Sequence, residues 1–156
     1  MIWKKPHISK VYEALTAMAD SRIKLEDDNH AKCFSSMRDK IYDIKYDPET
    51  RDIISNDNTA YFTGAVSYPM IAFLMLTKRL LFSENLLSPL KGIVWQDINK
   101  KFKNDYAKSM EYVLENLRSK GVDIEVIKKE VREIYDEVIG MKLKYSGKKM
   151  RPPLNY

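Results

Sequence analysis

The sequence predicts an α+β fold: a small antiparallel β-sheet of about four strands packed on a buried helix, followed by a C-terminal helical hairpin. Three patterns indicate this class. Short runs before residue 56 alternate apolar and polar residues, residues 69–76 are apolar on nearly every side, and two amphipathic helical stripes occupy residues 95–140. A chain of 156 residues is long enough for one domain with a core of its own.

We expect three parts along the chain. Residues 1–92 form an α/β core domain, residues 93–141 form a helical hairpin packed on that core, and residues 142–156 form a flexible basic tail. The tail carries five Lys or Arg and no acid, whereas the first 141 residues hold 22 basic and 22 acidic side chains. The net charge of +5 therefore belongs to the tail, and the neutral body is not typical of a nucleic-acid-binding surface.

The first part begins with a helix and continues with short strands. A helix is expected over residues 9–20, where Ser9 is the cap and Val11, Leu15 and Met18 recur at helical spacing. The expected strands are residues 22–26, 31–35, 40–46 and 51–55. Turn-forming residues between them predict an up-and-down meander.

Pro69 opens the most apolar run of the chain, and we expect the other elements to cover this run. Proline is favourable at the start of a helix, where its missing N–H is not needed. Apolar residues on nearly every side from Met70 to Leu76 are typical of a helix buried in a core. Lys78 and Arg79 follow well before the about 20 apolar residues that a membrane span needs, so no membrane segment is predicted.

The helical hairpin is predicted from two amphipathic stripes and the stop between them. One helix is expected from Trp95 to Ser119, and the next from its cap at Asp123 to Gly140. Gly121 lies between them and is typical of a helix stop, because glycine adopts the left-handed conformation readily. The short connection predicts antiparallel packing. This hairpin is the expected contact for a protein partner or for a homo-oligomer.

Residue types that carry chemistry are scarce in this chain. It has one cysteine, Cys33, and two histidines, His7 and His30, so a metal site or a nucleophile with its base is hard to assemble. We find no phosphate-binding loop, dinucleotide fingerprint or nucleophile elbow. No catalytic residue, metal site or cofactor is therefore predicted. The single thiol and the lack of an apolar leader in residues 1–10 predict a cytoplasmic location.

A polar cluster at the strand-to-helix crossing is the first candidate binding site, and aromatic rings flank it. Two interpretations stay open. In a recognition loop, the amide and carboxylate groups would bind a ligand and the rings would stack on it. In an Asx turn, the same polar residues would only shape the backbone, and this interpretation is favoured because turn chemistry explains the residue types. The residues are Ser55, Asn56, Asp57, Asn58, Tyr61, Phe62 and Tyr68.

The basic tail is the second candidate site. A flexible cationic segment can neutralise phosphates without a fixed shape, and Pro152–Pro153 would keep its end extended. The alternative is a solubilising tail with no partner. The cations are Lys142, Lys144, Lys148, Lys149 and Arg151.

The order of elements in residues 19–82 resembles the SWIM zinc finger, a ββα module with a C-x-C pair after its hairpin and a C-x-H pair at its helix start. Aligned on the hairpin end and the helix start, the four ligand places hold Ser55, Asp57, Met70 and Ala72. Zinc is normally bound by Cys and His with occasional carboxylates, so Asp57 alone makes no site. The resemblance implies a SWIM-like fold with an apolar core in place of its metal. Since SWIM modules are associated with DNA binding and with protein partners, it also implies such a partner.

Taken together, these patterns predict a non-enzymatic binding module that acts on a nucleic acid or on a protein attached to one, with DNA or RNA held by the basic tail. Two alternatives stay open. One is an enzyme of small-molecule or nucleotide metabolism whose pocket lies at the Ser55–Asn58 turn, and the other is an assembly subunit that uses the helical hairpin. A concave pocket at the turn would favour the enzyme, whereas a flat basic surface with aromatic rings would favour the binder.

Overall fold

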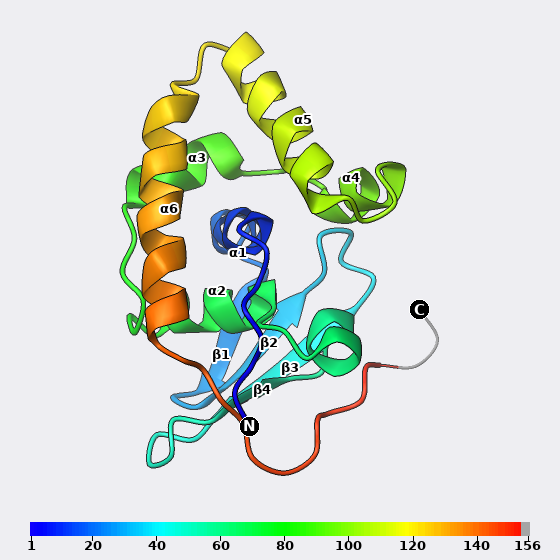
Figure 1. Cartoon of the computed structure of the whole chain (residues 1–156), viewed down its shortest axis with the longest axis vertical. Coiled ribbons are helices and arrows are strands. Elements are labelled where there is room, and N and C mark those ends of the chain that lie inside the picture. The colour runs from blue at the N-terminus through cyan, green and yellow to red at the C-terminus, as the bar shows by residue number, and fades with distance from the viewer. Residues whose placement is uncertain (154–156) are drawn as a thin grey trace.

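The computed structural model describes residues 1–153 and shows an α+β fold, as predicted (Figure 1). A four-stranded antiparallel sheet forms one side of the molecule, and α2 (Tyr68–Leu76) packs on it. Helix α1 (Ser9–Ala19) packs on α2. The hairpin of α5 (Tyr106–Ser119) and α6 (Ile124–Gly140) then covers α1.

The sheet is an up-and-down meander, in agreement with the sequence pattern. Its strands, in spatial order, are β1 (Ile23–Asp27), β2 (His30–Phe34), β3 (Ile41–Tyr46) and β4 (Ile53–Ser55). The register pairs Ala31 with Ile44 and Ile44 with Ser55, and these buried residues share the covered face. The other face carries Lys32 and Asp43, whose ion pair measures 2.8 Å. The alternation of buried and charged residues therefore gives a sheet with one face on the core and one in water.

Helix α2 is buried on every side, as its apolar run predicted. All seven residues from Pro69 to Met75 are buried, and Phe73 has no exposed surface. The ring of Tyr46 in β3 packs against Phe73, with 5.8 Å between ring centroids. Across residues 1–153, no helix is long and apolar enough to cross a membrane.

Helix α1 is buried far more completely than its amphipathic pattern suggested. Residues 9–17 are all buried, and the charged residues Lys10 and Glu13 are among them. The reason is tertiary, because α1 lies between α2 on one side and the α5–α6 hairpin on the other. Its Thr16 hydroxyl donates to the carbonyl of Leu90 at 2.8 Å.

The single helix expected over residues 95–119 is wrong, because the structure has two helices there. The short helical segments of the chain are η1 (Thr59–Thr63), η2 (Glu84–Leu86), α3 (Leu87–Leu90) and α4 (Trp95–Lys101). Between α4 and α5, Lys103 and Asn104 adopt φ of 52° and 63°, and Asp105 caps α5 by accepting from the Lys108 N–H. Asn and Asp favour such conformations and caps. The apolar stripe continues across the break, so periodicity alone does not show it.

The C-terminal segment differs from the expected flexible tail in its first residues. Leu143 and Tyr145 are buried, and the Tyr145 ring lies against Trp3 with 4.1 Å between centroids. The N–H of Trp3 donates to the carbonyl of Leu143 at 2.9 Å. These contacts join two chain ends that are remote in sequence, so composition could not show them. Residues 154–156 of the predicted tail lie outside the described part of the chain.

Replacing Phe73 by alanine should lower the free energy of unfolding by about 3–5 kcal/mol, because a fully buried ring is lost and a cavity remains. The matched control is Phe62→Ala, which removes the same atoms from a ring that is 72% exposed and should change stability by about 0.5 kcal/mol or less. Denaturant titration followed by circular dichroism measures both. Equal effects of the two changes would contradict the central position of α2.

Candidate functional site

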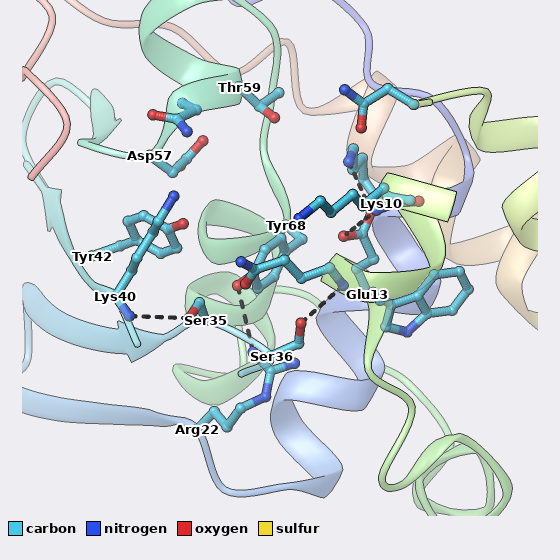
Figure 2. A pocket seen from close by; sticks show the side chains of 16 residues that line it. Lys10, Glu13, Arg22, Ser35, Ser36, Lys40, Tyr42, Asp57, Thr59 and Tyr68 are labelled. Carbon is cyan, nitrogen blue, oxygen red and sulfur yellow. Dashed lines mark hydrogen bonds and ion pairs between the residues drawn. The ribbon is translucent and has the colours of Figure 1, made fainter. Parts of the chain in front are cut away.

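A hollow of about 310 Å³ opens between α1, the sheet and α4, a volume at the lower end of small-molecule sites (Figure 2). Its walls come from the helices α1 and α4, the strand β3, the start of α2, and the α1–β1, β2–β3, β4–α2 and α4–α5 connections. The charged residues of its lining are Lys10, Glu13, Arg22, Lys40, Asp57 and Lys100. Figure 2 shows the side chains of Lys10, Glu13, Lys40, Asp57 and Tyr68 arranged around one space. Residues far apart in the sequence thus form a polar site beside the core.

Lys10 and Glu13 form a buried ion pair on the wall of this hollow. They lie one turn apart on α1, their charged atoms are 2.8 Å apart, and each side chain is 7% exposed. Lys10 Nζ also lies 3.9 Å from the ring centroid of Tyr106, and Glu13 Oε1 accepts from Asn99 Nδ2 at 3.4 Å. A buried ion pair contributes little net stability, because desolvation offsets the attraction. Its position places two opposite charges on the wall of the hollow.

Arg22 is the most deeply buried cation of the lining, with a side chain 2% exposed. Its Nη1 donates to the carbonyl of Phe34 at 2.7 Å and lies 3.4 Å from the Tyr68 hydroxyl. The nearest carboxylate paired with it is that of Asp20, 3.8 Å from Nε, which is too long for a hydrogen bond. The guanidinium is thus fixed by neutral oxygens, and its charge is only partly compensated.

Three buried polar atoms in the lining make no hydrogen bond with residues 1–153. They are Glu13 Oε2, Arg22 Nε and Asn99 Oδ1. Glu13 Oε2 still has its ion-pair contact with Lys10, but the other two have no such close partner. Buried polar atoms in folded proteins nearly always have a partner in the protein or in water. These atoms therefore indicate room for water or for a polar ligand.

Asp57 is the centre of a buried hydrogen-bond network next to the hollow. Its carboxylate accepts from the hydroxyls of Ser55 and Ser67, at 2.6 Å each, and from the N–H of Ala60 at 2.9 Å. All four residues are buried. The network ties the end of β4 to η1 and to the start of α2, and it places the acid in the wall of the hollow.

The structure brings part of the predicted polar cluster to the hollow. Asp57 and Asn58 line it, whereas Ser55 lies behind Asp57 as a hydrogen-bond donor. Asn56 is turned toward β3, where its Oδ1 accepts from the N–H of Asp43 at 2.8 Å. The cluster therefore contributes both to the backbone turn and to the wall of a concave site.

Of the three aromatic residues predicted to flank the polar cluster, one lines the hollow and two lie outside it. Tyr68 lines the hollow, and burial raises the pKa of its phenol well above the usual value, so that the hydroxyl keeps its proton at neutral pH. Tyr61 and Phe62 lie outside the lining, with their rings edge to face at 5.0 Å. Phe62 is 72% exposed.

The basic residues of the predicted tail lie away from this hollow. Lys142 and Lys144 border a separate hollow of about 480 Å³. Lys148, Lys149 and Arg151 border a third one, of about 440 Å³, together with Tyr61.

Most residues of the lining carry no signal in the sequence that would mark them as part of a site. One signal was available, and it would have indicated Lys10 and Glu13. These two opposite charges are three residues apart in a helix that is expected to pack in the core. No local signal exists for contacts such as that of the Gln96 N–H with Ser36 Oγ at 3.0 Å, which joins α4 to the β2–β3 connection. The further missed residues are Arg22, Ser35, Lys40, Tyr42, Thr59, Trp95, Asn99, Lys100 and Asn104.

Cys33 and His30 have different environments in β2. Cys33 is fully buried, and burial raises the pKa of its thiol to about 12. His30 lies at the strand start and pairs with Asp27 at 2.8 Å. Over the described residues, no group of three or more His, Cys, Asp and Glu side chains could hold a metal ion. At the ligand places of the SWIM alignment, Met70 and Ala72 lie in the buried part of α2.

The chain belongs to the family described as uncharacterised conserved protein UCP014422, whose profile matches residues 3–144. The match covers every residue that lines the charged hollow and ends before Lys148, Lys149 and Arg151. No curated protein and no solved structure matches the chain. The SWIM resemblance, which none of these comparisons tests, stays a prediction.

Replacing Asp57 by alanine should lower the free energy of unfolding by about 3 kcal/mol or more, because two buried hydroxyls and one N–H lose a charged acceptor. Denaturant midpoints measure the effect. Asp28→Ala, in the exposed β1–β2 turn, is the control and should change stability by about 0.5 kcal/mol or less. Indistinguishable midpoints for the two variants would show that the network does not anchor the turn.

The Cys33 thiol should be unreactive in the native protein at pH 8. Its raised pKa keeps it protonated until the pH approaches 12, and the protonated thiol is a poor nucleophile. Absorbance of the anion released from a disulfide thiol reagent measures the reaction, and denaturant should restore one reactive thiol per chain. A full equivalent released rapidly without denaturant would contradict the enclosed position of Cys33.

Proposed function

We propose that this chain binds a small organic anion in the hollow between α1, the sheet and α4. The observation that carries the proposal is the concentration of buried charge on the walls of one open hollow. Four charged residues of its lining are buried, namely Lys10, Glu13, Arg22 and Asp57. Cations outnumber acids in the described lining by four to two. Such a site favours a ligand with a carboxylate or a phosphate group.

The distribution of partners within the hollow also favours an anion. Glu13 is compensated by Lys10, and Asp57 is held by three hydrogen-bond donors. Arg22 has no carboxylate within hydrogen-bond distance in the described structure. Its planar guanidinium matches the geometry of carboxylate and phosphate oxygens. Arg22 is therefore the residue best placed to bind the charged group of the ligand.

Neutral polar groups on the walls indicate that the ligand is more than an inorganic ion. Ser36, Thr59, Gln96 and Asn99 all line the hollow. Hydroxyl and amide groups of this kind bind hydroxyls and amides of a ligand, and the orphaned Asn99 Oδ1 is one acceptor available for them. The proposal agrees with the small-molecule alternative from the sequence, since Asp57 and Asn58 form part of the wall. It is confined to binding and assigns no reaction.

The test is a thermal-shift screen followed by calorimetry. The panel contains inorganic phosphate, nucleoside monophosphates, sugar phosphates, dicarboxylates and amino acids, so that its arms separate phosphate from carboxylate ligands. Lys40→Ala should raise the Kd of the best ligand about tenfold or more, because a charge-assisted hydrogen bond contributes about 1.5–3 kcal/mol and 1.4 kcal/mol is tenfold. Lys45→Ala removes the same charge from an exposed position of β3 and is the matched control.

Two results would overturn the proposal. One is a panel in which no compound raises the Tm in a concentration-dependent way. The other is a ligand whose Kd is unchanged by both Lys40→Ala and Arg22→Lys, since it would then bind elsewhere on the chain.

A further inference from the structure

A second surface with a different charge pattern runs along the C-terminal segment, residues 142–151. The segment leaves α6 and crosses the lower edge of the molecule in Figure 1, past the N-terminus. Two hollows adjoin this segment, the helix-end hollow and the tail hollow. The helix-end hollow, of about 480 Å³, has the cations Arg51, Arg79, Lys142 and Lys144. The tail hollow, of about 440 Å³, has Lys148, Lys149 and Arg151. Neither has an acidic residue in the lining that the structure describes.

The helix-end hollow collects its cations from three distant parts of the chain. Arg51 belongs to the β3–β4 connection, Arg79 follows α2, and Lys142 follows α6. The guanidinium of Arg79 lies over the ring of Tyr46, 4.2 Å from its centroid, which fixes the position of this charge. The fourth cation, Lys144, is partly compensated, because Asp52 lies 3.7 Å away. The hollow therefore keeps a strong net positive charge.

The tail hollow has cations and Tyr61 in its lining, and the exposed ring of Phe62 lies beside Tyr61, outside that lining. Lys149 Nζ donates to the carbonyl of Tyr61 at 3.2 Å and so holds the C-terminal segment against η1. The Tyr61 ring supports the Phe62 ring edge-on, with an angle of 89° between their planes. Phe62 itself is 72% exposed, so most of its ring is open to solvent. Exposed rings beside Lys and Arg are typical of surfaces that stack unpaired bases.

We propose that this surface binds single-stranded nucleic acid, with phosphates at the two hollows and a base stacked on Phe62. Two cationic hollows along one segment favour a ligand with repeated negative charges over a single small anion. A base can stack on the Phe62 ring only if it is not already stacked between neighbouring bases, and the bases of a duplex are so stacked. The proposal goes beyond small-anion binding and shares no residue with the charged hollow beside α1.

Fluorescence anisotropy of the full chain with labelled oligothymidylate, oligouridylate and a duplex of equal length, across a salt series, tests the proposal. The two single strands distinguish DNA from RNA, and at least one should bind more tightly than the duplex. The triple variant Lys148→Ala, Lys149→Ala, Arg151→Ala should bind about tenfold or more weakly. It should also reduce the salt slope by about 2, because each phosphate contact contributes about 0.7 on a single strand.

Two further variants separate stacking from charge. Phe62→Ala should weaken binding by about fivefold or more and leave the salt slope unchanged, because stacking involves no counterion. The charge-matched control is the triple variant Lys120→Ala, Lys128→Ala, Lys129→Ala. These three residues are exposed on the α5–α6 hairpin, and their loss should leave the salt slope nearly unchanged.

The proposal is overturned if the full chain shows no salt-dependent binding to either single strand, or if the two triple variants lose affinity equally. It is also overturned if the duplex binds as well as the single strands and Phe62→Ala has no effect. The two proposals can be contradicted independently of each other. The C-terminal triple variant should keep its affinity for the small anion, and Lys40→Ala should keep its affinity for nucleic acid.

Discussion

Helix α2 has no polar side, so the fold has to shield it from water on all sides. The sheet covers one side of α2 and α1 covers another, with Phe73 and its neighbours fully buried between them. Because α1 is then internal as well, the α5–α6 hairpin has to cover α1 in turn. Burial of the apolar run thus determines the order of the layers.

The same layering explains why a charged hollow lies beside the core. Once α1 is covered, only 7% of the Lys10 and Glu13 side chains stays exposed, and the two charges pair with each other. Arg22 and Asp57 are held close by through hydrogen bonds to Phe34, Ser55 and Ser67. Four buried charges therefore line one open hollow, and salt screens charges in such positions weakly.

The two proposed sites differ in physical character. In the hollow beside α1, the proposed binding would depend on buried charges, whose interactions salt screens weakly, and on neutral polar groups of the lining. At the C-terminal surface, Lys148, Arg151 and the Phe62 ring are exposed, so the proposed binding there would depend on counterion release and stacking. The family match ends at residue 144, so it includes the first site in full and only part of the second.

Local sequence patterns are sufficient to predict three features of the fold: the strand alternation, the all-apolar α2, and the Gly121 stop before the cap at Asp123. The hollow and the docking of Tyr145 on Trp3 depend on tertiary packing, which no local pattern encodes. Periodicity reports which side of an element faces inward, but not which element it meets. The contact between Glu13 and Asn99 joins residues 86 positions apart, and such a pairing depends on the packing of whole helices.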